Sequence, residues 1–76
     1  MTEWLDKVAL VTGGRSGIGA AIATALADVG VRVITAQRAT DPTHEAIEAD
    51  FLDPAAPEQA VSEVVERAGR LDILIN

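Results

Sequence analysis

The sequence predicts a doubly wound α/β fold in which four parallel strands alternate with two main helices. Three observations lead to this expectation: short apolar runs that are continuous rather than alternating, two segments with helical spacing of apolar residues, and the order strand, helix, strand, strand, helix, strand. Continuous apolar runs are typical of strands that are buried on both faces, as in a parallel sheet. Helices then serve as the crossovers between successive strands.

The first half of the chain contains two predicted strands and one helix. Residues 7–12 are an apolar run rich in β-branched side chains, and residues 31–36 form a second such run. Between them, residues 17–29 have helical periodicity, and Gly30 is the expected C-terminal stop of this helix. The expected buried stripe of the helix consists of Ile18, Ile22, Ala25, Leu26 and Val29.

The second half repeats this order with a weaker first strand over residues 44–49. A helix is expected from Pro54 or Pro57 to Ala68, followed by a glycine stop at residue 69 and a last strand over residues 71–75. One helical face carries Val61, Val64, Val65 and Ala68. Only seven residues lie between Ala36 and His44, too few for a crossover with its own helix. We therefore expect either a bare loop here or a shorter third strand.

Composition excludes several classes of protein. A chain of 76 residues has room for one domain at most, and no cysteine and a single histidine provide neither a disulfide framework nor a metal cluster. Either self-association or a larger surrounding fold must then support the small core. A net charge of -6 argues against nucleic acid or an anionic membrane as partner. No signal peptide or membrane-spanning run is apparent, so a cytoplasmic location is expected.

Residues 12–19 read Thr-Gly-Gly-Arg-Ser-Gly-Ile-Gly and lie between the first strand and the first helix. An α/β sheet places its ligands at such a turn, where glycines permit a close approach and the helix start attracts phosphate. The motif lacks the Gly-Lys-Ser/Thr of a nucleoside triphosphatase, because Ala20 and Ala21 follow it. A methyltransferase that binds adenosyl-methionine is a further alternative, but Gln37 stands where such an enzyme normally has an acid. Diphosphate binding is the predicted role.

The glycine spacing resembles that of the short-chain dehydrogenase/reductase family, Thr-Gly-x-x-x-Gly-Ile-Gly. Two further landmarks agree: Asp50-Phe51 is similar to the family's acid-hydrophobic pair at the adenine, and residues 71–76, Leu-Asp-Ile-Leu-Ile-Asn, resemble the start of its Asn-Asn-Ala-Gly strand. The resemblance covers residues 7–76. It implies a Rossmann-type nucleotide-binding domain, an NAD(P) cofactor and hydride transfer between the nicotinamide and a small-molecule carbonyl or alcohol.

The resemblance also implies roles for individual residues. Thr12 would brace the turn, and the cofactor phosphates would be lined by Gly13, Arg15, Ser16, Gly17, Ile18 and Gly19. Asp50 would accept a hydrogen bond from the adenine amino group beside the backbone of Phe51, and Asn76 would border the adenosine ribose. Asp50 could instead be a solvated acid at a strand end or a helix cap.

The end of the second strand bears on the choice between NADP and NAD. An acid there would bind the ribose 2′-hydroxyl, whereas an arginine accommodates a 2′-phosphate. This chain has Gln37 and Arg38 at that point, and Arg15 could add a second positive charge. We predict NADP(H), with NAD as the alternative. Asp41, in the short loop, is a further candidate for the ribose.

The family's reaction centre is not found in these residues. The family uses a tyrosine with a lysine, but the chain has no tyrosine, and its one lysine, Lys7, precedes the first strand. His44 is expected to be a surface residue. We therefore expect residues 1–76 to be the N-terminal part of one Rossmann domain, cut after the fourth strand and inactive alone, within a homo-oligomeric enzyme. The alternative is a non-catalytic module that senses or sequesters NADP(H).

Overall fold

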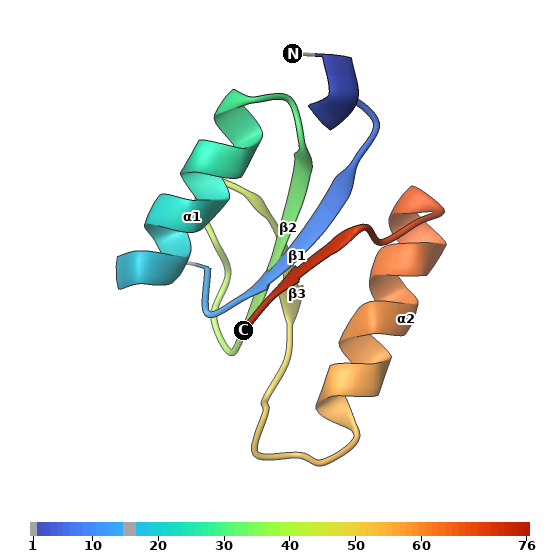
Figure 1. Cartoon of the computed structure of the whole chain (residues 1–76). Helices are drawn as coiled ribbons and strands as arrows, with labels where there is room; N and C mark the ends of the chain where they lie inside the picture. The colour runs from blue at the N-terminus through green and yellow to red at the C-terminus, as the bar shows by residue number, and fades with distance from the viewer. Residues whose placement is uncertain (1, 15–16) are drawn as a thin grey trace.

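The computed structural model describes residues 2–14 and 17–76, and it contains one four-stranded, fully parallel sheet in the order β3-β2-β1-β4 (Figure 1). In chain order the elements are the 3-10 turn η1 (Thr2–Trp4), β1 (Val8–Thr12), α1 (Gly17–Asp28), β2 (Arg32–Gln37), β3 (Glu45–Glu48), α2 (Ala56–Ala68) and β4 (Ile73–Ile75). The predicted fold class is therefore confirmed.

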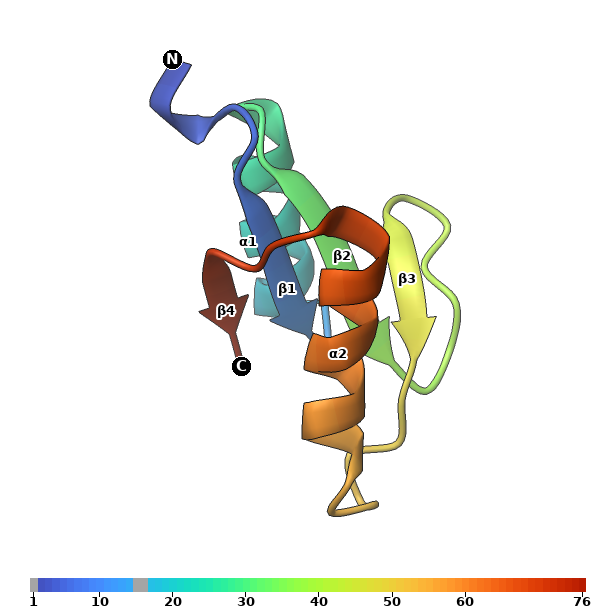
Figure 2. The same cartoon turned by 90° about the vertical axis from the view of Figure 1, so that its right-hand side faces the viewer.

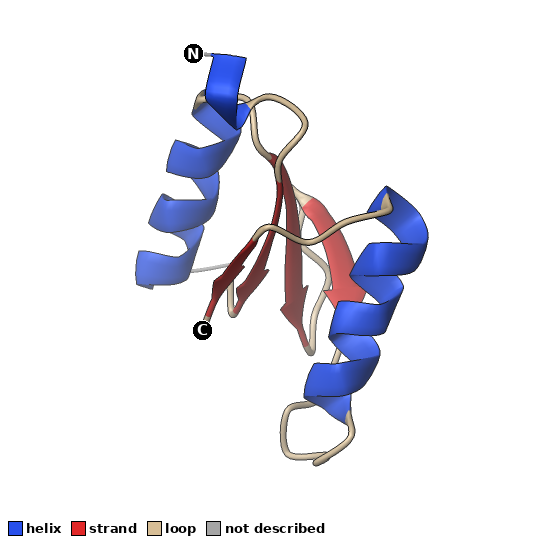
Figure 3. Ribbon diagram, turned by 45° about the vertical axis from the view of Figure 1, so that its right-hand side comes forward, coloured by secondary structure: helices blue, strands red, loops and turns tan. Residues whose placement is uncertain are grey.

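The two main helices cover opposite faces of the sheet, with α1 on one side and α2 on the other (Figure 3). The central strand β1 is buried from both sides, because residues 8–11 are each at most 3% exposed. One core cluster joins this strand to α2 through Ala60 and Val64, and a second joins it to α1 through Ala23. The continuous apolar run thus has the two-sided burial expected of a parallel strand.

The buried face of α1 differs from the expected stripe. Ile18 is 81% exposed and Val29 is 37% exposed, whereas Ala23 is completely buried. Gly19 lies against the turn after β1, so the helix approaches the sheet through its smallest residues. A close approach leaves no room for large side chains on that face, and this is why Ile18 points away from the core.

The helix α2 has the predicted C-terminal stop and a slightly rotated buried face. Gly69 adopts a left-handed φ of 80°, and its N–H donates to the Val65 carbonyl at 2.8 Å. The fully buried positions are Ala56, Ala60 and Val64, and Val65 is 46% exposed. The helix therefore also faces the sheet with a row of small side chains.

The crossing from β2 to β3 is a bare loop of residues 38–44, and β3 has only four residues. Both alternatives from the sequence thus apply, because the loop has no helix and the strand is shorter than expected. Figure 2 shows the loop returning from the end of β2 to the start of β3. Register pairs Ile34 with Glu45 and Gln37 with Glu48, so both strands run parallel without an intervening helix.

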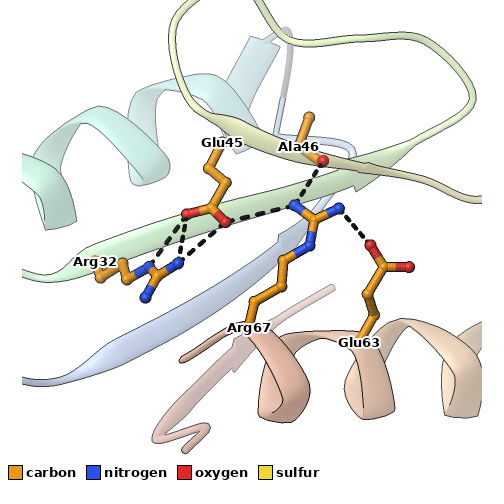
Figure 4. Close-up of polar contacts among 5 residues, drawn as sticks. All are labelled: Arg32, Glu45, Ala46, Glu63 and Arg67. Carbon is orange, nitrogen blue, oxygen red and sulfur yellow. Dashed lines mark hydrogen bonds and ion pairs between the residues drawn. The ribbon is translucent and has the colours of Figure 1, made fainter. Parts of the chain in front are cut away.

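An ion-pair network on the surface connects β2, β3 and α2 (Figure 4). Glu45 accepts from Arg32 at 3.1 Å and from Arg67 at 3.4 Å. Arg67 also donates to the Ala46 carbonyl at 3.2 Å and contacts Glu63, four residues earlier on α2. Side chains therefore connect the edge strand β3 to the neighbouring strand β2 and to the helix α2.

Residues 2–14 and 17–76 contain neither a membrane-spanning helix nor a cluster of metal-ligating side chains. Neither helix described there combines the length and the apolarity that crossing a membrane requires. No group of three or more histidine, cysteine, aspartate or glutamate side chains suitable for a metal ion was found among the same residues.

Candidate functional site

The predicted site residues that the structure describes gather at one edge of the sheet. Because all four strands are parallel, their carboxyl ends meet there, and the residues that directly follow β1, β2, β3 and β4 share this edge. These residues are Gly13, Arg38, Ala49 and Asn76. Open α/β sheets bind their ligands outside this edge.

The turn after β1 is built around close contacts that require glycine. Gly13 has a φ of +67° and donates its N–H to the Ala36 carbonyl at 2.9 Å. A β-carbon at Gly19 would lie 2.5 Å from the Gly13 carbonyl oxygen, so the first turn of α1 rests directly on this backbone. A β-carbon at Gly13 or Gly17 would meet no other atom within 4 Å, so the backbone there borders open space, and we call this part of the turn the glycine cradle. Arg15 and Ser16, two of the predicted site residues, lie outside the described residues.

The start of α1 is suited to an anion. The helix begins at Gly17, with a φ of +62°, and its first turn contains no acidic residue. The first N–H groups of a helix have no partners within it and carry the positive end of the helix dipole. Phosphate binding is favoured by this geometry. Ile18 is in the same turn and is exposed to solvent.

Thr12 and Asn76 are 64 residues apart in the chain and meet at this edge. The Thr12 hydroxyl donates to the Ile75 carbonyl at 3.3 Å and to the Asn76 side-chain oxygen at 3.4 Å. Thr12 therefore braces the end of β4 from the end of β1.

A hollow of about 350 Å³ lies between the turns that follow β1, β2 and β3. Its lining residues are Gly13, Ala36, Gln37, Arg38, Ala49, Asp50, Phe51 and Leu52. Arg38 and Asp50 are both exposed, and Phe51 is 39% exposed. The hollow thus presents a cation, a carboxylate and an aromatic ring beside the glycine turn.

Asp50 also shapes its own turn, since its Oδ1 accepts from the Leu52 N–H at 3.0 Å. Leu52 also lines the hollow and is 86% exposed, although it is not among the site residues predicted from the sequence. Its signal in the sequence is a large apolar residue directly after the Asp50-Phe51 pair.

A second, more apolar hollow of about 490 Å³ lies on the α2 side of the same edge. It shares Thr12, Gly13, Phe51 and Asn76 with the predicted site. Its apolar lining also includes Leu10, Pro57, Val61 and Leu74. Gly13 and Phe51 therefore separate two adjacent hollows.

Gln37 and Asp41 take part in hydrogen bonds within the β2–β3 connection. The Gln37 side-chain amide donates to the Thr35 hydroxyl at 3.2 Å and to the Ala39 carbonyl at 3.0 Å. The Thr35 hydroxyl in turn donates to Asp41 Oδ2 at 3.0 Å. Asp41 Oδ1 accepts from the backbone N–H groups of Thr43 and His44.

The carboxylate of Asp41 is stabilised in its charged form. Burial by itself would raise the pKa of Asp41, but its hydrogen bonds with Thr43, His44 and Thr35 together hold the pKa below its usual value. One oxygen bonds within the loop and the other bonds Thr35 of β2, which is a different role from the ribose contact considered for Asp41. The only sequence signals for this arrangement are a threonine within an apolar strand and an Asp-Pro pair in the loop.

Comparison with known proteins agrees with the family resemblance seen in the sequence. The family model for short chain dehydrogenases matches residues 7–76. An uncharacterised oxidoreductase of Staphylococcus saprophyticus is 40% identical, with all of this chain and 38% of that protein aligned. D-threitol dehydrogenase of Mycolicibacterium smegmatis is 41% identical, over 92% of this chain and 32% of that protein. The chain thus spans about a third of the length of these relatives.

The alignment with the staphylococcal protein is longer than the chain itself. An alignment of 91 positions against 76 residues requires at least 15 positions at which this chain has no counterpart.

Solved structures also resemble this chain. Ligand-free aldohexose dehydrogenase of Thermoplasma acidophilum has a TM-score of 0.86 at 29% identity, covering 96% of this chain and 29% of that one. A short-chain dehydrogenase/reductase double mutant of Serratia marcescens has a TM-score of 0.85 at 39% identity, covering 96% and 36% of the two chains. Together with the family match over residues 7–76, these likenesses show that the chain belongs to the short chain dehydrogenase family.

Proposed function

We propose that residues 1–76 form the cofactor-binding front part of an NADP(H)-dependent oxidoreductase. The enzyme would transfer hydride between the nicotinamide and the carbonyl or alcohol carbon of a small molecule. The observation that carries the proposal is the hollow in which Gly13, Arg38 and Asp50 lie together beside the start of α1. The names of two relatives, a threitol dehydrogenase and an aldohexose dehydrogenase, support a hydroxyl or carbonyl substrate.

Each part of this edge has a proposed task in holding the cofactor. The glycine cradle and the first N–H groups of α1 would hold the diphosphate, with Arg15, Ser16 and Ile18 beside it. Asp50 would accept from the adenine amino group, next to the Phe51 backbone, and Asn76 would border the adenosine ribose. A bound nicotinamide would give or accept the hydride, while this part of the chain would bind and orient the cofactor.

Arg38 supports NADP(H) over NAD. Its guanidinium is exposed at the end of β2 and lines the same hollow as Asp50. A planar guanidinium can donate two hydrogen bonds to one phosphate, whereas the ribose 2′-hydroxyl of NAD has no charge to attract it. Gln37 adds no carboxylate that would repel a phosphate at this strand end.

The reacting groups would come from residues outside this segment. Lys7, the one lysine, immediately precedes β1 and is therefore at the edge of the sheet opposite the glycine turn. With no tyrosine in the segment, a proton donor for the substrate oxygen must lie elsewhere in the protein. Homo-oligomerisation belongs to the same proposal and rests on the family resemblance, and the cytoplasmic location expected from the sequence is part of the proposal as well.

Fluorescence titration of the whole protein with NADPH and NADH tests the proposal. NADPH should bind more tightly, and Arg38→Ala should remove about 1.5–3 kcal/mol of NADPH binding free energy, the range for a hydrogen bond to a charged group. NADH binding should change much less. Lys7→Gln, which removes one positive charge at the opposite edge, is the matched control. Tighter binding of NADH by the parent protein would contradict the NADP(H) assignment, and binding without turnover of any alcohol or carbonyl would favour the sensing module.

A further inference from the structure

The turn that carries Arg38 is held by side-chain hydrogen bonds, and no helix follows it. Residues 38–44 connect β2 to β3 without regular structure, and Asp41 lies near the middle of this loop. Its carboxylate reaches back to the Thr35 hydroxyl at 3.0 Å, in the strand that leads into the loop. Asp41 therefore fastens the middle of the loop to β2.

Thr35 is the contact between this loop and the glycine turn. It is completely buried, and it is the one polar residue among the buried side chains of the described residues. A β-carbon at Gly14 would lie 2.6 Å from the Thr35 methyl group, so that methyl is packed on the glycine turn. The hydroxyl of the same side chain bonds Asp41 and Gln37. The Thr35 side chain thus contacts both the glycine turn and the loop that follows β2.

Gln37 continues the chain of contacts around Arg38. Its amide nitrogen bonds the Thr35 hydroxyl before Arg38 and the Ala39 carbonyl after it, at 3.2 and 3.0 Å. The backbone carbonyl of Gln37 also accepts from the Ala49 N–H at 2.8 Å, just after β3. The backbone of Arg38 is therefore bracketed on both sides, while its side chain is exposed to the hollow.

We propose that Asp41 is a positioning residue for the cofactor's 2′-phosphate: acting through Thr35 and Gln37, it holds the turn that carries Arg38 beside the glycine turn. This inference rests on the proposed preference for NADP(H). It assigns to Asp41 a role in selecting the cofactor without contact with the cofactor. Since only Arg38 would touch the phosphate, loss of the hydrogen bonds that join Asp41, Thr35 and Gln37 should weaken NADPH binding and leave NADH binding nearly unchanged.

Asp41→Asn is the most selective variant. Its remaining side-chain oxygen can still accept from the N–H groups of Thr43 and His44, but its amide nitrogen cannot accept the Thr35 proton and can only donate to the Thr35 hydroxyl, so a neutral bond replaces the stronger bond to a carboxylate. We expect the ratio of the NADH and NADPH dissociation constants in the whole protein to fall about fivefold, the effect of one hydrogen bond. Thr43→Ala, in the same loop, is the matched control and should leave the ratio unchanged.

Two variants of Thr35 separate the effect of its hydroxyl hydrogen bonds from the effect of its methyl packing. Thr35→Val keeps the methyl group against Gly14 and removes the hydroxyl, so the ratio should fall as in Asp41→Asn. Thr35→Ser keeps the hydroxyl, and we expect it to retain the ratio of the parent. In an Arg38→Ala background, Asp41→Asn should have no further effect on the ratio, because the residue that it positions is gone.

Three outcomes of these titrations would overturn the proposal. They are an unchanged ratio in Asp41→Asn and Thr35→Val, an equal weakening of both cofactors, and an effect of Asp41→Asn that persists without Arg38. Hydrogen exchange of the cofactor-free protein provides a measurement that is independent of NADP(H). Amides of residues 37–41 should exchange faster in Asp41→Asn than in the parent, and unchanged exchange there would refute the positioning role. A parent without preference for NADPH would instead refute the NADP(H) assignment, leaving the exchange measurement to decide whether Asp41 holds the turn.

Discussion

The carbonyl oxygen of Gly13 lies where it would contact any side chain at Gly19, with only 2.5 Å to a β-carbon built there. The first turn of α1 therefore rests on the backbone of the glycine turn, and this contact determines how close the helix start comes to the site.

Gly19→Ala should disturb both stability and cofactor binding. The neighbour is rigid backbone, so α1 must shift, at a cost of about 1–3 kcal/mol for overpacking. Urea unfolding of the whole protein, followed by far-ultraviolet circular dichroism, measures the effect. Thr24→Ala, at an exposed position of the same helix, should leave the midpoint unchanged or raise it slightly. An unaltered midpoint in Gly19→Ala would disprove the close contact.

Asp72 should make stability depend on pH in acid. Its bidentate contact with Arg70 and its bond from the Val8 N–H lower the pKa of Asp72 to about 2, against the opposing effect of burial. A pKa depressed in the folded state stabilises the fold above the unfolded pKa of about 4, and this contribution is lost as the pH falls towards 2.

Thermal unfolding between pH 5 and pH 2 tests this dependence on the whole protein. Asp72→Asn should flatten the fall of Tm between pH 4 and 2. Asp28→Asn, at the end of α1, serves as control and should retain the slope of the parent. Equal slopes in all three proteins would mean that Asp72 does not contribute.

The Glu45 network should contribute little to stability and do so only at low salt. Arg32, Glu45 and Arg67 have side chains that are 34–47% exposed, and exposed pairs contribute about 0.2–1 kcal/mol each. Glu45→Gln should therefore lower Tm slightly in dilute buffer, and the difference should vanish in about 1 M NaCl, where the Debye length is about 3 Å. Arg67→Ala should retain part of its effect in salt, because Arg67 also bonds the Ala46 carbonyl.

The polypeptide of residues 1–76 alone should not catalyse hydride transfer. It has no tyrosine, and its lysine is at the edge of the sheet away from the glycine turn. NADPH absorbance at 340 nm with aldose or ketone substrates should stay constant with this polypeptide and fall with the whole protein. Turnover by the purified segment would show that the reaction centre lies within it.

The same polypeptide should associate through β4. This strand is at the edge of the sheet and contains Ile73, Leu74 and Ile75, of which Leu74 is 51% exposed. Exposed apolar edge strands promote aggregation, and a charge on the edge opposes it. Leu74→Lys should increase the soluble fraction of the segment, whereas Glu66→Lys, on the exposed surface of α2, should not. Light scattering of the purified polypeptides measures the difference.

Several features of this protein follow from local sequence alone. Apolar runs of β-branched residues predicted the buried strands, and glycine at positions 30 and 69 marked the helix ends, where the structure has φ values of 102° and 80°. The spacing of Gly13, Gly17 and Gly19 identified the family. These features could be predicted because each depends on the conformational preference of a few neighbouring residues.

Other features were decided by the tertiary structure. Periodicity placed Ile18 in the buried stripe, but Gly19 has to face Gly13, and that requirement turns Ile18 outwards. Thr12 meets Asn76 because β1 and β4 are neighbours in register. The bonds from Thr35 to Asp41 and Gln37 depend on the path of a loop that has no periodic pattern. The sequence thus determined the fold class and the glycine turn after β1, whereas contacts between distant elements decided which side chains face the candidate site.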